Sequence, residues 1–302
     1  MAKIFCFISI LLVCFNTKGQ SLRHDTKLQN ILEKNTAGFG GVIGVYVENL
    51  KTGRFAAVNA DTIFPTASMI KIPIMIGTFS HILNGKLGYN QILTYKDSLK
   101  YDDGLVGSFR DSTKIAVSEL IYLMETVSDN TASLWLQGLV KGERINNLMD
   151  SLGMKVTRVN SRTSGRREFQ KIYGWGQTTP REMVALMKML RRGEIFSKDV
   201  SLRMYRTLGS QYWDGEGLSQ VPENVKTAYK SGAVDRSKSE VMLVHAPHGD
   251  YVFCMITKMQ TDTQWNKDNE GYRAARRISA ALWKYFEPKS KWSLPQGYEK
   301  WL

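Results

Sequence analysis

The chain has 302 residues, of which 43% are hydrophobic, and it carries a formal net charge of +13 at pH 7. This length is enough for one large domain or two interlocked subdomains. The basic residues are scattered and are not interleaved with aromatic residues, which argues against a nucleic-acid partner.

The N-terminus has the pattern of a secretory signal. A basic start at Lys3 precedes an apolar stretch over residues 4–15, and Thr17-Lys18-Gly19 follows, which offers the small residues Thr17 and Gly19. This stretch is too short and too early for a spanning helix, so we expect residues 1–19 to be a signal peptide. Cys14 leaves lipidation open as an alternative, although the residue before it is larger than a lipobox normally takes. We expect a secreted or periplasmic protein.

The cysteines and the apolar stretches exclude further features of the mature chain. Two of the three cysteines lie in the signal, which leaves Cys254 alone and excludes a disulfide within the mature chain. No later stretch is apolar enough to cross a bilayer, so no stable membrane insertion is expected. A monomer is expected.

Strand patterns occupy both ends of the mature chain and helical patterns its middle. A short helix is expected near 28–34, strands at 41–47, 54–58, 227–230, 240–244 and 251–258, helices between 68 and 208, and a last helix over 269–285. This order predicts one α/β (α+β) domain over 20–302. Its antiparallel sheet is built from residues of about 20–66 and 215–302 and flanked by helices, with an inserted all-helical part over 67–214. A site is expected between the two parts.

The stretch Phe64–Met75 is a candidate nucleophile segment. Ser68 and Lys71 are one helical turn apart, so their side chains share a face. A serine hydroxyl needs a nearby base, and a lysine in an apolar site has a lowered pKa and can be that base. The backbone N–H of Ser68 at a helix start can help to hold an oxyanion. Taken alone, the pair also fits a solvated serine and a surface lysine.

Two further motifs complete the pattern. Ser128-Asp129-Asn130 lies between two helical stretches, and Lys230-Ser231-Gly232 ends a strand. Lys51-Thr52-Gly53 also matches K-[ST]-G, but it lies before Ser68 in a hairpin turn and is read as structural. The ordered set S-x-x-K, S-D-N and K-[ST]-G is the signature of class A β-lactamases and penicillin-binding proteins. The chain therefore resembles a class A β-lactamase-type serine hydrolase over nearly all of its mature length.

The resemblance implies a role for each motif residue. Ser68 is the acylated nucleophile and Lys71 its base. Ser128 relays a proton to the leaving nitrogen, and Lys230 supports Ser128 electrostatically. Asn130 binds the amide of the substrate side chain.

The remaining positions of the third motif would bind substrate. Ser231 receives the substrate carboxylate, and the N–H groups of Ser68 and Ala233 form the oxyanion hole. Gly232, between Ser231 and Ala233, belongs to the same substrate-binding stretch. Arg236 or Lys238 adds positive charge for that carboxylate, or lies in a solvated turn.

The loop between the second and third motifs departs from the family. Class A enzymes hydrolyse the acyl-enzyme with a loop glutamate, whose place here falls on Thr163. The Arg–Asp pair that closes the loop is also missing, since its places fall on Ser161 and Gly176. Glu168 is the nearest carboxylate and a candidate deacylation base; the alternative is a surface glutamate paired with basic neighbours. Lys71 serving both steps is a further option.

Three hypotheses follow. The chain is a serine β-lactamase, or a same-fold amide or ester hydrolase acting on cell-wall peptides, or a binding protein that acylates and stops. Losing a general base removes a rate factor of about 10²–10⁴, which favours slow deacylation. No cofactor is expected. His245, His248 and Asp250 lie in a turn without a further closing ligand, so no metal is expected either.

Overall fold

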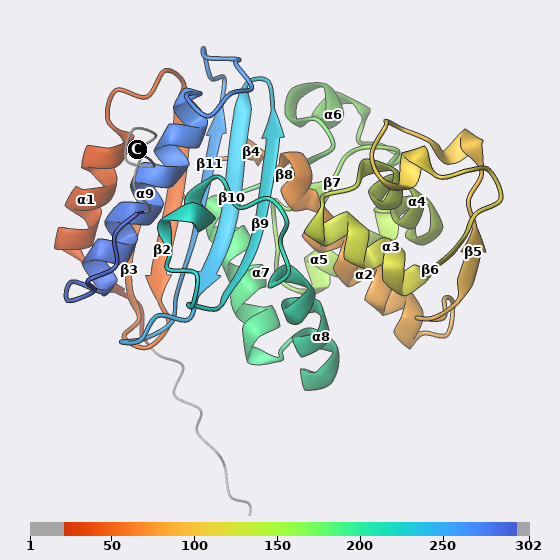
Figure 1. Cartoon of the computed structure of the whole chain (residues 1–302), viewed down its shortest axis with the longest axis horizontal. Helices are drawn as coiled ribbons and strands as arrows, with labels where there is room; N and C mark the ends of the chain where they lie inside the picture. Colours follow the sequence, from red (N-terminus) through yellow and green to blue (C-terminus); the bar gives the residue numbers. More distant parts are fainter. Residues whose placement is uncertain (1–20, 295–302) are drawn as a thin grey trace, which may run out of the picture.

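The computed structural model describes residues 21–294, and it is built around a six-stranded sheet (Figure 1). The strand order is β1-β3-β2-β11-β10-β9; β1 pairs with β3 in parallel, and every other neighbouring pair is antiparallel. The strands are β1 (Arg23–His24), β2 (Val42–Asn49), β3 (Arg54–Val58), β9 (Thr227–Val234), β10 (Ser237–Val244) and β11 (Tyr251–Lys258). N-terminal and C-terminal strands therefore meet in the middle of one sheet.

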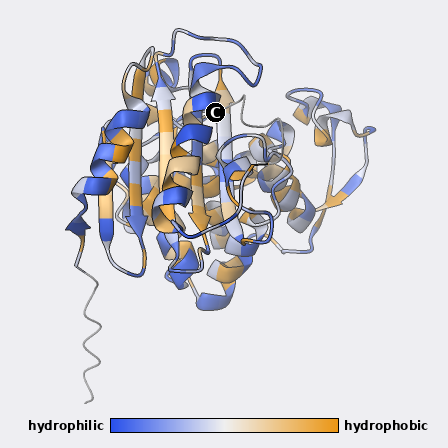
Figure 2. Ribbon diagram, turned by 60° about the vertical axis from the view of Figure 1, so that its left-hand side comes forward, coloured by the Kyte–Doolittle hydropathy of each residue, from blue (hydrophilic) through white to orange (hydrophobic). Residues whose placement is uncertain are grey.

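Helices cover both faces of this sheet. α1 (Thr26–Thr36) and α9 (Glu270–Phe286) lie together on one face, and α7 (Pro180–Arg192) packs against β2, β10 and β11 from the other. Each face has its own hydrophobic core, and the larger core continues into the helical part. Figure 2 shows hydrophobic residues along the strands and hydrophilic residues on the helices and loops around them.

The helical part stands beside β9. Its elements are α2 (Lys71–Leu83), α3 (Val117–Thr126), α4 (Asn130–Val140), α5 (Gly142–Ser151), α6 (Arg167–Tyr173) and α8 (Lys198–Leu208), with a two-stranded sheet of β5 (Ile92–Thr94) and β6 (Lys114–Ala116). A three-stranded sheet of β4 (Phe64–Pro65), β8 (Gly176–Thr178) and β7 (Arg158–Val159) lies between the two parts. Four short 3₁₀ helices over the described residues complete the set: Ala67–Ile70, Asp97–Leu99, Val106–Ser108 and Gly217–Gln220.

The predicted fold class is confirmed, with differences at element ends. The last helix begins at Glu270 and ends at Phe286, one residue later than expected at each end. The first helix is longer than predicted, because Asp25 caps it by accepting the N–H of Leu28 at 3.0 Å. The predicted signal peptide and Cys14 lie outside the described residues. Within 21–294, no helix is both long and apolar enough to cross a bilayer.

Candidate active site

Ser68 lies in a tight turn at the head of α2. The 3₁₀ helix Ala67–Ile70 contains it, and α2 begins directly afterwards at Lys71. Ala67 has a φ of 44°, a left-handed conformation that is uncommon for a residue with a Cβ. Strained backbone of this kind is held in place by its surroundings and concentrates at functional sites. The turn presents the Ser68 hydroxyl toward the junction of the two parts.

Lys71 is the centre of the polar site. Its side chain is fully buried, and Nζ lies 3.0 Å from Ser68 Oγ, 3.0 Å from Ser128 Oγ, 2.6 Å from the Ser128 carbonyl oxygen and 2.8 Å from Asn130 Oδ1. The carbonyl and amide oxygens can only accept, so they take two N–H bonds. The remaining Nζ position faces two hydroxyls that can donate, which is the arrangement of a neutral amine ready to take a proton.

The electrostatic environment of Lys71 favours this neutral form. Burial, and then the positive charge of Lys230, hold the pKa of Lys71 well below its ordinary value, against the opposing charges of Glu125, Asp129 and Asp102. A base with a lowered pKa is what activation of a serine hydroxyl requires.

Ser128 lies between the two lysines. Lys230 Nζ donates to Ser128 Oγ at 2.9 Å, while Lys71 contacts the same oxygen from the other side. Ser128 itself has a φ of 61°, and Lys230 is buried on β9. Burial lowers the pKa of Lys230 to about 8, opposed by the charges of Glu125 and Glu216. The pair of lysines therefore forms one connected proton path through a single hydroxyl.

The two residues after Ser128 have different tasks. Asp129 is buried and caps α4, accepting from Ala132 N at 2.8 Å and from Val106 N at 2.9 Å, so it holds the loop in shape. Asn130 accepts from Lys71 and donates from Nδ2 to Asp102 Oδ2 at 2.6 Å, which fixes the direction of its amide.

The end of β9, near its turn into β10, forms the wall of the site next to Ser68. At Gly232, an added Cβ would stand 2.6 Å from Ser68 N and 2.9 Å from the carbonyl oxygen of Thr66. Only glycine lets the strand approach the turn this closely. Ala233 consequently lies beside Ser68, and both line the same two cavities, as an oxyanion hole requires.

Two cavities open on either side of Ser68. The larger, about 650 Å³, runs between the loop after α6 and the end of β9, and includes Asn130 and Arg236. The smaller, about 340 Å³, includes Ser128, Ser231 and Lys238. A third cavity of about 710 Å³ lies around residues 205–227 and includes none of the motif residues. The cavities that meet at Ser68 are therefore the relevant ones.

Arg236 and Lys238 differ from each other in setting. The Arg236 guanidinium donates to the carbonyl oxygens of Gln260 and Met259 at 3.2 and 3.4 Å, at the edge of the larger cavity. Lys238 is buried, and its Nζ donates to Val234 O at 2.8 Å in the smaller cavity. The solvated-turn reading does not hold for Lys238.

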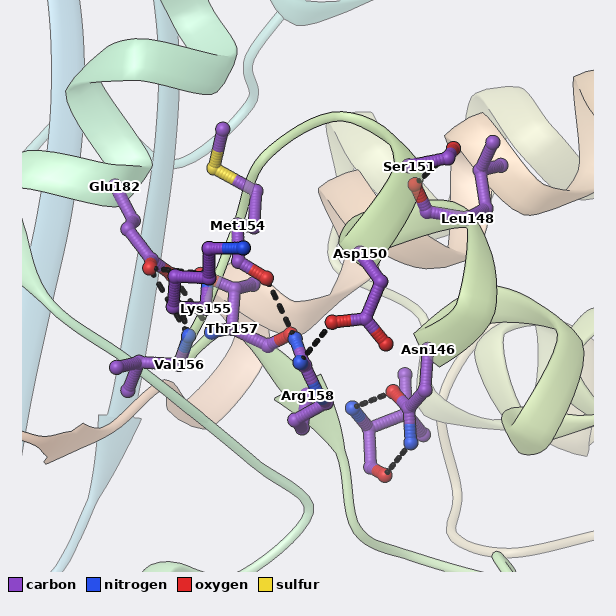
Figure 3. A network of polar contacts seen from close by, with 11 residues as sticks. Asn146, Leu148, Asp150, Ser151, Met154, Lys155, Val156, Thr157, Arg158 and Glu182 are labelled. Carbon is purple, nitrogen blue, oxygen red and sulfur yellow. Dashed lines mark hydrogen bonds and ion pairs between the residues drawn. The ribbon is translucent and has the colours of Figure 1, made fainter.

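The loop between the second and third motifs is closed by Glu182 (Figure 3). Its carboxylate accepts three consecutive backbone N–H groups, those of Lys155, Val156 and Thr157, at 2.6–2.9 Å, and the Thr157 hydroxyl at 2.6 Å. Arg158 adds an ion pair to Asp150 at the end of α5. These contacts fix the start of the loop where the family's Arg–Asp pair is missing.

The two loop positions of interest lie apart from Ser68. Thr163 packs on the start of α5, since a Cβ on Gly142 would stand 1.8 Å from Thr163 Oγ1. Glu168 is largely solvent-exposed and accepts from Lys171 Nζ at 2.8 Å. Neither lines the cavities that meet at Ser68. The structure therefore does not bring Glu168 to the site.

Sequence reasoning missed several residues that the fold adds. Asp102 reaches Asn130, and Tyr101 and Trp175 contact edge to face, with centroids 5.0 Å apart, on the wall of the larger cavity. Glu125, three residues before Ser128 in the chain, is fully buried. Its signal was present in the sequence, because it lies four residues after Ile121 on the apolar face of its helix. Asp102 had no comparable signal.

Comparison with known proteins establishes the family. The model of the β-lactamase enzyme family matches residues 23–286, so the chain belongs to that family. The β-lactamase VEB-1 of Pseudomonas aeruginosa is 21% identical over 304 residues, covering 94% of this chain and 97% of that protein. The β-lactamase regulatory protein BlaB of Streptomyces cacaoi is 35% identical over 97 residues, which span only 31% of each protein.

Solved structures agree on the fold. PBP-A is 24% identical with a TM-score of 0.77, covering 88% of this chain and 98% of that one. A class A β-lactamase from Mycobacterium abscessus is 22% identical with a TM-score of 0.76, covering 86% and 99%. The expected resemblance to class A β-lactamases and penicillin-binding proteins is confirmed at the level of family and fold.

Proposed function

We propose that this protein is a serine acyl-transferase of the β-lactamase family that opens a β-lactam amide and forms an ester on Ser68. The observation that carries the proposal is the buried Lys71 amine, whose Nζ lies within hydrogen-bond distance, 3.0 Å, of both Ser68 Oγ and Ser128 Oγ. Nucleophile, base and proton relay lie within hydrogen-bond distance of one another, as covalent catalysis by serine requires.

Acylation follows from these contacts. Neutral Lys71 takes the proton of the Ser68 hydroxyl as Oγ attacks the carbonyl carbon. The oxygen that gains charge accepts the N–H groups of Ser68 and Ala233; removal of one such donor typically costs about 10²–10³ in rate. Collapse breaks the C–N bond, and Ser128 donates its proton to the leaving nitrogen. Lys71 returns its extra proton to Ser128 across their 3.0 Å contact.

Lys230 has a separate task in this scheme. Its ammonium donates to Ser128 Oγ at 2.9 Å, which stabilises that oxygen while it passes its proton. With the Ser231 hydroxyl it also offers positive charge and a donor to a substrate carboxylate in the smaller cavity, which Ser231 lines.

Deacylation is proposed to be slow. In the described part of the chain, no carboxylate lines the larger cavity, where the acyl group would lie. A water attacking the ester there must rely on Lys71, which lacks the help of a second base.

A cell-wall peptide is the second candidate substrate, and the larger cavity favours it. Besides the aromatic pair Tyr101 and Trp175, its lining includes three cationic side chains, Lys171, Arg236 and Lys258. An extended acyl arm that carries carboxylates fits this wall better than a small neutral one. The N-terminal pattern supports action outside the cytoplasm, where such peptides occur.

The test is to mix the protein with a chromogenic cephalosporin and follow colour and intact mass together. We expect a burst of about one equivalent and a lasting adduct, both absent in Ser68→Ala. Sustained fast turnover would instead show an efficient β-lactamase with another deacylation base. Neither colour nor adduct would reject the lactam and leave the peptide candidate, tested by acylation with a D-alanyl ester.

A further inference from the structure

Glu125 is an unusual residue for the inside of a protein. It lies in the last turn of α3, three residues before Ser128, and is fully buried. Within the described part of the chain, neither of its carboxylate oxygens has a hydrogen-bond partner. An unpaired buried carboxylate costs several kcal/mol, and residues of similar size without charge fit such a place more favourably. Its burial calls for a charge of opposite sign nearby.

The two charges that act on Glu125 are those of the site lysines. Burial raises the pKa of the Glu125 carboxyl to about 7, while Lys230 and then Lys71 oppose this rise. In turn Glu125 raises the pKa of both lysines against the lowering effect of their burial. No direct hydrogen bond or ion pair joins Glu125 to either lysine, so the effect is one of charge through a dry interior.

The other carboxylates with large effects differ between the two lysines. They are Asp129 and Asp102 for Lys71, and Glu216 for Lys230. Asp129 already caps α4, and Asp102 holds Asn130, so both have local partners. Glu125 is the carboxyl with the largest opposing effect on both Lys71 and Lys230.

We propose that Glu125 is a positioning residue of the acyl-transfer site, whose carboxylate keeps Lys230 protonated beside Ser128 while Lys71 is neutral beside Ser68. The proposal rests on the function proposed above. Its physical basis is charge compensation in a buried cluster, where the Glu125 carboxylate offsets the Lys230 ammonium. Without this carboxylate the cluster has one negative charge fewer, so it releases the Lys230 proton more readily.

The test compares Glu125→Gln, which keeps the shape, with Glu125→Asp, which keeps the charge. The rate of adduct formation on Ser68 is measured by intact mass across the pH range. The acid limb of this pH–rate profile reports the protonation of Lys71, and the alkaline limb reports the deprotonation of Lys230. In Glu125→Gln both limbs move to lower pH, the alkaline limb by about one unit, which is about tenfold in rate on that limb. Glu125→Asp retains most of the original profile.

The matched control is Glu33→Gln, which removes the same charge at an exposed position of α1, on the far side of the sheet. Its profile stays that of the unchanged protein. A Glu125→Gln profile with both limbs in place would overturn the proposal, even if its overall rate were lower.

A second measurement does not depend on the reaction. Lysine labelled with ¹³C at Cε is titrated by NMR, and the two site signals are assigned with Lys71→Arg and Lys230→Arg. Glu125→Gln lowers both titration midpoints, and Glu125→Asp lowers them less. Unchanged midpoints refute the role of Glu125, whereas changed midpoints in a protein that forms no adduct refute the proposed function alone. If Glu125→Gln does not fold, Glu125→Leu is titrated in its place, because it also removes the charge from this buried position, and an unmoved Lys230 midpoint in that variant decides against the role.

Discussion

At the scale of single residues, the site depends on very close approaches. Lys71 has four oxygen neighbours, two of which can only accept, and this leaves one position for a hydroxyl proton. Gly232 allows β9 to approach the Ser68 turn so closely that a Cβ at this position would stand only 2.6 Å from Ser68 N. Both features are geometric conditions for chemistry, not contributions to a hydrophobic core.

Gly232→Ala is therefore expected to impair acylation. The new Cβ would stand 2.6 Å from Ser68 N and 2.8 Å from Ser239 Oγ, so the strand must move away and widen the oxyanion hole. We expect the rate of adduct formation to fall by about 10²–10³, the range for loss of one oxyanion donor. The rate is measured with the chromogenic cephalosporin at saturating and low concentration.

Gly138→Ala is the control for that experiment. It lies in α4, where nothing stands within 4 Å of the added Cβ, so the rate is expected to be unchanged and the helix slightly more stable. Equal rates in Gly232→Ala and the unchanged protein would show that the approach of β9 to Ser68 is not needed.

At the scale of elements, the loop over residues 155–179 is held by contacts that the family pattern does not predict. Glu182, in the first turn of α7, accepts three N–H groups from the loop's start, and Asn146 on α5 exchanges two hydrogen bonds with the backbone of Val159 at 2.7 and 3.0 Å. Arg166 then bridges Asn160 and Gln177 across the loop. The loop is thus held by the Glu182 carboxylate, the Asn146 amide and the Arg166 guanidinium, together with the Arg158–Asp150 ion pair.

Glu182→Ala is expected to destabilise the protein by about 2–4 kcal/mol, because it leaves three N–H groups and a buried hydroxyl without their charged acceptor. Urea unfolding followed by circular dichroism measures the change. The control is Glu194→Ala, an exposed carboxylate whose one ion pair spans 4.0 Å and contributes little. Similar midpoints for both variants would contradict this account of the loop.

At the scale of the whole molecule, buried charge should shape the dependence of stability on pH. Burial and the charge of Glu216 raise the pKa of Glu240 to about 8, from an ordinary value of 4.5. Between these values the folded protein holds a proton that the unfolded chain has released, so stability falls as pH rises. Lys230, with its pKa lowered to about 8 from 10.5, has the opposite slope at higher pH. Glu240 therefore lowers stability as pH rises toward 8, and Lys230 raises it above pH 8.

Glu240→Gln tests this dependence. The amide oxygen still accepts from Gly217 N and the Tyr229 hydroxyl, but the side chain no longer ionises. We expect the free energy of unfolding to fall less from pH 5 to pH 8 than in the unchanged protein, by on the order of 1–3 kcal/mol. Glu223→Gln, at an exposed position, serves as the control. Parallel curves for Glu240→Gln and the unchanged protein would exclude Glu240 as a cause.

The sequence by itself determined the family and the general fold. The three motifs could be recognised because each is only a few residues long. They are Ser68 with Lys71, Ser128-Asp129-Asn130, and Lys230-Ser231-Gly232. Strand periodicity at both chain ends likewise predicted the sheet, since alternation of side chains is a local property. The absence of the loop glutamate at Thr163 was visible for the same reason.

Only the tertiary structure decided how these patterns combine. Ser128 meets Lys71 across 57 positions of the chain and Lys230 across 102, and no local rule fixes such distances. Glu168 is the carboxylate nearest in sequence to the place of the family's glutamate, but its side chain is exposed to solvent and pairs with Lys171 on α6. Glu125 had no place in the pattern, yet burial makes its charge matter. A charge gains its effect from the medium around it, and that medium exists only after folding.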